Sequence, residues 1–172
     1  MGETPRKRID YAGSVHDEAE IAAVVEVLSG SPTALRIGKN VRKLEQLVAA
    51  TFAGTVDIEV DLAEMVNSGS SALYLAVELL RPQPGDEIIT SPVTFSTDIA
   101  PMARAGVTPV FVDVTPNTYQ LDTVSLEAAV TDRTTAILVP NLIGNCPDWD
   151  VIRDVADRHD LVVIEDSCDC MG

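Results

Sequence analysis

The sequence is poor in basic residues and has no long apolar run, and each scarcity excludes a class of protein. Only 12 lysines and arginines stand against 27 acidic residues, which leaves a formal net charge of −15. Such a charge repels phosphate backbones and anionic surfaces, so we expect neither nucleic acid nor a membrane as a partner. No apolar run approaches the roughly 18 residues that span a bilayer, and the first residues lack the core of a signal peptide. We therefore expect a cytoplasmic protein.

Cysteine is also scarce, and two common nucleotide-binding motifs are missing. The three cysteines, Cys146, Cys168 and Cys170, are an odd number, which argues against the disulfide framework of a secreted domain. They are expected to be reduced thiols or metal ligands. The sequence contains neither the Gly-x-Gly-x-x-Gly run of dinucleotide-binding proteins nor the Gly-Lys-Ser/Thr end of a P-loop.

The second part of the sequence has the rhythm of an α/β fold. Short apolar runs, typical of strands, alternate there with helical patterns, as in βαβ units. Right-handed crossovers between such strands place helices on both faces of a mostly parallel open sheet. We expect strands near residues 63–66, 87–90, 109–113, 135–140 and 161–166, and helices near residues 71–80, 96–105, 123–130 and 149–158.

The first part of the sequence predicts an arm followed by two helices. Apolar residues recur at helical spacing over residues 17–28, and Ser29-Gly30-Ser31-Pro32 ends that run. A second helical pattern covers residues 41–48, with Asn40 placed to cap it. We therefore divide the chain into an amino-terminal arm with helices, 1–54, and an α/β domain, 55–172.

Polar residues follow several predicted strands, at the edge where an open α/β sheet binds its ligand. Asn67-Ser68-Gly69-Ser70-Ser71 opens a helix, and its amides and hydroxyls suit one phosphate group, although a plain Ser-capped helix has the same pattern. Asp166 ends the last strand, where its carboxylate could pair with a protonated ring nitrogen or merely cap the next turn. Phe95 could stack on a planar ligand or simply pack, and Asn141 and Asn145 could bind a ligand or supply turn geometry.

Four ordered motifs together resemble the fold-type I pyridoxal-phosphate enzymes, and within them the DegT/DnrJ/EryC1/StrS sugar aminotransferase family. The resemblance runs from about Ile9 to Gly172 and is strongest to the branch of NDP-4-keto-6-deoxyhexose 3-dehydrases. The motifs are Asn67-Ser68-Gly69-Ser70-Ser71-Ala72-Leu73, Pro92-Val93-Thr94-Phe95-Ser96-Thr97-Asp98-Ile99-Ala100-Pro101, Leu142-Ile143-Gly144-Asn145 and Glu165-Asp166-Ser167-Cys168-Asp169.

The resemblance implies a role for each candidate residue. Asp166 would pair with the pyridinium nitrogen and keep the ring protonated, so that the ring can accept electrons. Asp169 stands where the aminotransferases usually have Gln near the ring hydroxyl, a departure typical of the dehydrase branch. The other implied roles are phosphate binding by Gly69, Ser70 and Ser71, ring stacking by Phe95, cofactor contact by Asn141 and substrate contact by Asn145.

The resemblance also implies a reaction and its partners. Members of this branch use pyridoxamine phosphate to eliminate the 3-hydroxyl of a nucleotide 4-keto-6-deoxy sugar as water. An iron–sulfur cluster, [2Fe-2S], then supports reduction by a flavin and iron–sulfur reductase. Cys168 matches the position of the first cluster ligand, while the other ligands would lie outside this chain; a structural thiol is the alternative.

In the family, the fold continues past the matched region with further strands and a smaller domain, which contain a Schiff-base Lys or a catalytic His. The lysines of this chain, Lys7, Lys39 and Lys43, all precede the first predicted strand. We therefore expect little turnover from the chain alone, and a homodimer or a heteromer with the missing half. The alternatives are a sugar aminotransferase relative, a non-catalytic binding partner of a full-length homologue, and an unrelated flavodoxin-like or Rossmann-like module.

Overall fold

The computed structural model describes residues 13–35, 38–53 and 63–170 of a chain that forms two compact units, Met1–Met65 and Val66–Gly172. The predicted domain boundary between residues 54 and 55 lies outside the described residues and stays a prediction. Within the described ranges, no helix has both the length and the apolar composition that crossing a membrane requires.

The first helix of the first unit is stabilised at its amino end by local hydrogen bonds. Helix α1 spans Glu18–Leu28 and follows Asp17, whose carboxylate accepts a hydrogen bond from the Ala19 amide at 2.8 Å. The Glu20 carboxylate accepts one from the Asp17 amide, also at 2.8 Å. This reciprocal capping box satisfies amides that have no partner within the helix, and the predicted first helix is confirmed.

The second helix of this unit begins one residue earlier than its predicted cap. After the 3-10 helix η1, Pro32–Leu35, helix α2 spans Lys39–Ala53. Asn40 therefore lies inside α2, and its predicted role as the cap was wrong. The physical reason is that the Gly38 carbonyl already accepts the Arg42 amide at 3.3 Å, so the helical hydrogen bonds start there.

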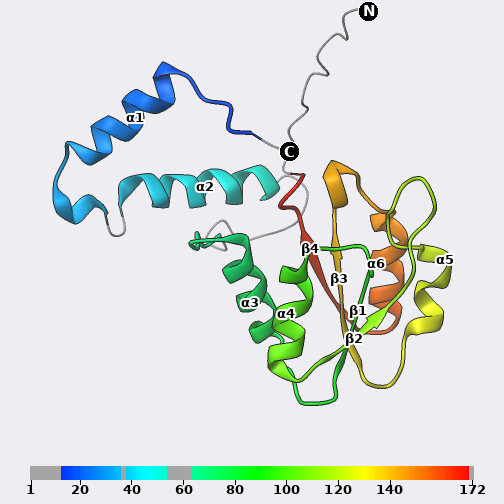
Figure 1. The fold of residues 1–172 in the computed structure, drawn as a ribbon. Helices are drawn as coiled ribbons and strands as arrows, with labels where there is room; N and C mark the ends of the chain where they lie inside the picture. The colour runs from blue at the N-terminus through cyan, green and yellow to red at the C-terminus, as the bar shows by residue number, and fades with distance from the viewer. Residues whose placement is uncertain (1–12, 36–37, 54–62, 171–172) are drawn as a thin grey trace, which may run out of the picture. The chain divides into compact units, whose positions relative to one another are not determined.

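The second unit is built on a parallel sheet, and the predicted fold class is confirmed (Figure 1). Its described strands are ordered β2-β1-β3-β4, and every neighbouring pair is parallel. The strands are β1 Glu87–Thr90, β2 Thr108–Phe111, β3 Thr134–Pro140 and β4 Val162–Asp166. The helices are α3 Gly69–Leu79, α4 Ser96–Ala105, α5 Thr123–Leu126 with η2 Glu127–Ala129, η3 Leu142–Gly144 and α6 Trp149–Arg158.

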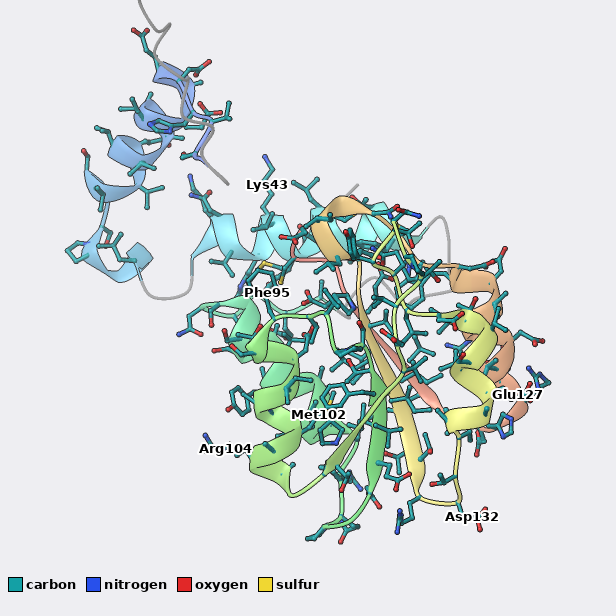
Figure 2. All side chains as sticks on the ribbon, turned by 45° about the vertical axis from the view of Figure 1, so that its right-hand side comes forward. Lys43, Phe95, Met102, Arg104, Glu127 and Asp132 are labelled. Atoms are coloured by element: carbon teal, nitrogen blue, oxygen red, sulfur yellow. The ribbon has the colours of Figure 1, made fainter. Side chains whose placement is uncertain are left out.

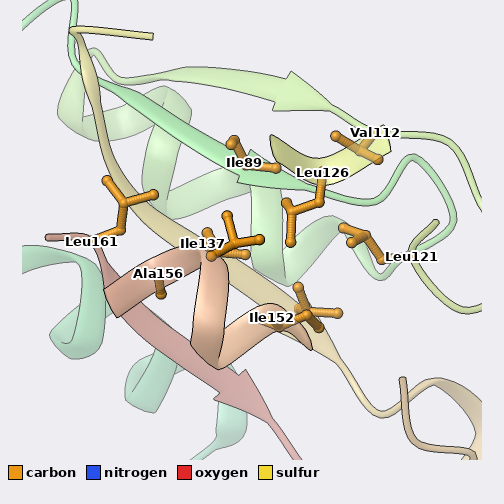
Figure 3. Close-up of a cluster of buried hydrophobic side chains, with 10 residues drawn as sticks. Ile89, Val112, Leu121, Leu126, Ile137, Ile152, Ala156 and Leu161 are labelled. Atoms are coloured by element: carbon orange, nitrogen blue, oxygen red, sulfur yellow. The ribbon is translucent and has the colours of Figure 1, made fainter. Parts of the chain in front are cut away.

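Helices cover both faces of the sheet and give it two apolar layers. Successive residues of a strand point to opposite faces, so Ile88 packs beneath α3 and α4 whereas Ile89 packs beneath α5 and α6. In β3, Leu138 and Ile137 divide in the same way, and the second layer is drawn in Figure 3. Strands buried on both faces explain why the sequence reads there as continuous apolar runs.

The first predicted strand, residues 63–66, was wrong, because these residues form no ladder with the described sheet. A segment becomes a strand only when a neighbouring backbone supplies its hydrogen bonds. The Met65 amide instead donates to the Glu45 carboxylate at 3.1 Å, and the Val66 side chain is 38% exposed. The apolar pattern indicated an extended segment but could not show whether a neighbour was present.

Replacing Leu138 with alanine tests the layer beneath α3 and α4. The side chain is fully buried, so Leu138→Ala removes packed methyl groups and leaves a cavity. We expect the free energy of unfolding, measured by urea denaturation, to fall by about 2–5 kcal/mol. The matched control is Leu79→Ala on α3, whose side chain is 80% exposed, for which a change below about 0.5 kcal/mol is expected. Equal losses in the two variants would contradict the two-layer core.

Candidate functional site

The carboxyl ends of β3 and β4 bring two of the predicted motifs together at one edge of the sheet (Figure 1). Pro140 of β3 pairs with Asp166 of β4, and the Asn141 amide donates to the Asp166 carbonyl at 2.9 Å. The two strands therefore end at the same level, and the loops that follow them lie next to each other.

The amino end of α3 completes this edge. Ser68 precedes the helix, and its Oγ accepts the Ser71 amide at 3.2 Å. Ser71 Oγ donates in turn to Asn67 Oδ1 at 2.6 Å. The Ser-capped helix that the sequence left open is thus present. This cap is compatible with an anion site. The first amides of a helix have no acceptor within the helix, and the cap occupies only that of Ser71, which leaves the amides of Gly69 and Ser70 for an anion.

Gly69 is the point where α3 and the loop after β4 come closest. A Cβ atom at Gly69 would lie 2.8 Å from Cys168 Sγ, nearer than real Cβ contacts allow, so a larger residue there would force the Cys168 side chain to move. The two residues also line one cavity of about 290 Å³. Its walls are formed by Gly69, Ala72, Leu73, Ala76, Ile164, Glu165, Asp166, Ser167 and Cys168, and none of these side chains is basic.

Asp166 lies in the wall of this cavity and is only 8% exposed. Its Oδ1 accepts the Cys168 amide at 3.0 Å, which closes the turn after β4. Asp166 therefore caps a turn, one of the two roles considered from the sequence, and it also lines the cavity, while its pairing with a ring nitrogen stays a prediction. A carboxylate held in this way is suited to bind a cationic group of a ligand.

Asp98, on α4, is the residue of this region to which the sequence gave no role. Its carboxyl group is fully buried and accepts a hydrogen bond from Thr94 Oγ1. Burial, and next the neighbouring Asp166, raise the pKa of Asp98 to about 6 against the opposing hydrogen bond from Thr94. The sequence held one signal, the helical spacing that puts Asp98 on the same face as the apolar residues Pro101 and Met102, and the structure buries all three.

Both polar atoms of the Asn141 side chain form hydrogen bonds with other residues of the chain. Its Nδ2 donates to Glu165 Oε1 at 2.5 Å and to Ser167 Oγ at 2.9 Å, and its Oδ1 accepts Trp149 Nε1 at 2.9 Å. The residue is 2% exposed. Within the described structure Asn141 thus fixes the ends of β3 and β4, and its predicted contact with a cofactor stays a prediction.

Asp169 joins the loop after β4 to the 3-10 helix η3. Its Oδ2 accepts the Ile143 amide at 3.1 Å. Ile143 has a φ of 53°, which is costly for a β-branched residue, and Gly144 follows with a φ of 76°. Asn145, next in the chain, is exposed and donates to the Thr118 carbonyl at 3.3 Å. Asp169 and Asn145 thus lie in hydrogen-bonded loops at the carboxyl edge of the sheet, and their predicted contacts with cofactor and substrate stay predictions.

Phe95 caps α4 at the same end of the unit, and Figure 2 shows it at the opposite end of that helix from Arg104. Its ring is 51% exposed and lies outside the lining of the cavity. The ring is therefore accessible to a planar ligand, but its predicted stacking role stays a prediction.

The described cysteines are free thiols. The pKa of Cys168 is raised to about 11, first by hydrogen bonding to Asp166 and then by partial burial and nearby carboxylates. Cys146 Sγ and Cys170 Sγ lie 4.0 Å apart. Among the described residues no group of three or more metal-ligating side chains occurs, so the cluster role of Cys168 stays a prediction.

Known proteins resemble this chain in both sequence and fold. A 3-dehydratase acting on dTDP-4-dehydro-2,6-dideoxy-D-glucose, from Saccharopolyspora spinosa, is 40% identical over 181 residues, or 99% of this chain and 36% of the relative. A UDP-2-acetamido-2-deoxy-3-oxo-D-glucuronate aminotransferase from Pseudomonas aeruginosa is 41% identical over 61% of this chain and 29% of the relative. This chain therefore spans about a third of the length of these curated relatives.

The fold is shared with solved structures of the same group of enzymes. A crystal structure of GDP-4-keto-6-deoxymannose-3-dehydratase with a trapped PLP-glutamate geminal diamine superimposes with a TM-score of 0.80 at 34% identity. The match covers 96% of this chain and 42% of that chain. The sequence profile of one family matches residues 14–172. The chain belongs to the DegT/DnrJ/EryC1/StrS aminotransferase family.

Proposed function

We propose that this chain forms the cofactor-binding part of an enzyme that removes the 3-hydroxyl group from a nucleotide 4-keto-6-deoxy sugar. One observation carries the proposal: Gly69, at the amino end of α3, and Asp166, at the end of β4, line the same cavity of about 290 Å³. This pairing offers an anion site and a carboxylate to a single ligand. Pyridoxal or pyridoxamine 5'-phosphate has the matching groups, a phosphate and a ring nitrogen that can be protonated.

The residues present fit that cofactor. The amides of Gly69 and Ser70 would hold the phosphate, since the cavity lining contains no basic side chain to do so. The Ser71 hydroxyl would join them by turning its proton from Asn67 Oδ1 to the phosphate. Asp166 would hold the proton on the ring nitrogen. The bound cofactor supplies an electron sink for the carbon that reacts. Phe95, exposed at the amino end of α4, would cover one face of the ring.

Two observations support the 3-dehydratase type. A 3-dehydratase relative matches 99% of this chain at 40% identity, while a solved aminotransferase structure matches 92% of it at 32% identity. Asp169 also occupies the position at which the resemblance places Gln in aminotransferases. Its carboxylate accepts the Ile143 amide, so it would fix the loop that presents Asn145 to the sugar. Removal of a hydroxyl group by a relative of aminotransferases is the function these features support.

The second unit places neither a lysine nor a histidine, the residue types that the resemblance implies for proton transfer, at the cavity. It has no lysine in its sequence, and its histidine, His159, follows α6 and bonds Glu127 at 3.2 Å. That position is at the end of α6 away from the cavity edge, because α6 begins with the loop that follows β3. The general acid–base group would therefore come from residues beyond those of this unit.

Replacing Asp166 tests the cofactor site. In an absorbance titration of this chain with pyridoxal 5'-phosphate, we expect saturable binding, and we expect Asp166→Ala to weaken it about tenfold or more. A charge-assisted hydrogen bond is worth about 1.5–3 kcal/mol, and each 1.4 kcal/mol is about a factor of ten. Asp150→Asn on the exposed side of α6 is the control and should bind like the wild type. Absence of saturable binding by the wild type would overturn the proposed function.

The reaction itself is tested by adding the family's remaining segment. We expect this chain alone to release no 3-deoxy sugar from a nucleotide 4-keto-6-deoxy sugar, because the acid–base group is lacking. Co-expression with the carboxyl-terminal part of a homologous 3-dehydratase should restore product formation, measured by mass spectrometry with pyridoxamine 5'-phosphate in excess as the two-electron donor. If restored complexes instead transfer an amino group to the sugar, the aminotransferase alternative is correct. Turnover by this chain alone would refute the assignment of the proton-transfer group.

Assembly is the third expectation for this function. β4 is an edge strand of the described sheet, and Val162 in it is 49% exposed, as is Leu75 of α3 at 52%. Exposed apolar surface of this kind favours association. We expect a homodimer, or a heteromer with a homologue, in sedimentation analysis at micromolar concentration; a well-behaved monomer would contradict this.

A further inference from the structure

Two thiols lie against each other at the carboxyl edge of the sheet. Cys146 follows η3 and Cys170 follows β4, and their Sγ atoms are 4.0 Å apart although the residues are 24 positions apart in the sequence. Cys146 is exposed and Cys170 is half-buried, so small molecules in solution can reach the pair. The Sγ atom of Cys168 lies instead against Gly69 of α3. Among the described residues, Cys146 and Cys170 are thus the thiols placed to react with each other.

The two loops that present these thiols are joined through their backbones. The Ile143 amide donates to Asp169 Oδ2 at 3.1 Å. A Cβ atom at Gly144 would lie 3.3 Å from the Asp169 carbonyl oxygen, so the loops are also in close contact there. Pro147, which is buried, follows Cys146 and restricts the backbone of Cys146. The contact between the thiols therefore follows from how the two loops are held together.

A disulfide bond between these thiols requires only a small movement. Bonded sulfur atoms lie about 2.05 Å apart, so the two Sγ atoms must approach each other by about 2 Å. Rotation about the Cα–Cβ bonds can supply this approach, because the Cys146 side chain is exposed and has room to turn. The backbone of Cys170 can stay in place, with its amide donating to the Ser167 carbonyl at 3.1 Å.

We propose that Cys146 and Cys170 form a redox-sensitive pair, which hydrogen peroxide oxidises to a reversible disulfide. One thiol attacks the peroxide, the O–O bond breaks, and a sulfenic acid and one water are formed. The second thiol attacks the sulfenic sulfur, forms the S–S bond and releases a second water. The two sulfur atoms together lose two electrons, which the peroxide gains. A thiol reductant reverses the reaction by exchange.

The disulfide would join the loop that follows β3 to the loop that follows β4. The latter contributes Asp166, Ser167 and Cys168 to the wall of the cavity, so the bond would restrain that wall. Cys168 stays outside the bond and keeps its place against α3. The pairing of the two thiols does not rest on the proposed function.

Mass spectrometry of the full chain tests which thiols react. Desolvation, and next the hydrogen bond with Cys170, raise the pKa of Cys146, so the oxidation is slow and is followed over hours at about pH 8.5. Hydrogen peroxide should lower the mass of the monomer by two hydrogen atoms, and dithiothreitol should restore it. Cys168→Ser should show the same loss, whereas Cys146→Ser and Cys170→Ser should not. A wild type that gains only oxygen atoms, stays unchanged or forms covalent dimers would overturn the proposal, as would a loss that requires Cys168.

A second experiment on the wild type shows whether the native fold selects this pair. In an unfolded chain Cys146 can pair with Cys168 or with Cys170, because the two closed loops have nearly the same length. Oxidation in native buffer should give the bond to Cys170 alone, and oxidation in concentrated urea should give both, as fragmentation of tryptic peptides distinguishes. The native disulfide should also raise the urea midpoint of unfolding by about 1–2 M, since it restricts the unfolded chain. The same mixture under both conditions, or a midpoint that does not rise, would refute the pairing.

Discussion

The parallel pairing of β3 with its neighbours is the constraint on which the rest of the second unit depends. Because β3 lies between β1 and β4 and is buried on both faces, its side chains anchor both apolar layers. Because the strands are parallel, their carboxyl ends meet at one edge. The pairing of Pro140 with Asp166 then sets the level at which the polar loops begin, and the loop after β4 lines the cavity together with α3.

Charge in this unit is separated between the two edges of the sheet. At the amino edge, basic side chains are engaged: Arg133 pairs with Glu87, and Arg158 pairs with Glu127. At the carboxyl edge, the cavity lining offers carboxylates and amides without a basic side chain. Such an edge can hold an anion only through backbone and hydroxyl groups, and it favours a ligand that also has a cationic part. A phosphate joined to a protonated ring satisfies both conditions.

A comparison of predicted and observed elements shows which features local sequence patterns identify. The strand 87–90 and the helices 96–105 and 149–158 were predicted with the bounds that the structure has, since apolar periodicity and turn residues are local signals. The strand at 63–66 was wrong because pairing depends on a neighbour that no local pattern reveals. The cap at Asn40 was wrong because hydrogen bonds one residue away competed with it. Asp98 had no assigned role because the burial of its carboxyl group depends on how α4 packs on the sheet.

The sequence by itself determined the α/β class, the order of most elements and the motifs that resemble one enzyme family, because these depend on residue types at short spacing. The tertiary structure decided what those residues contact. It showed that Asn141 is bonded to Glu165, Ser167 and Trp149 and that Gly69 admits Cys168. It also buried the Asp98 carboxyl group, one oxygen of which has no hydrogen-bond partner among the described residues. Contacts of this kind depend on strand register and helix packing, which bring together segments far apart in the chain. Patterns of residue types over a few positions therefore cannot predict them.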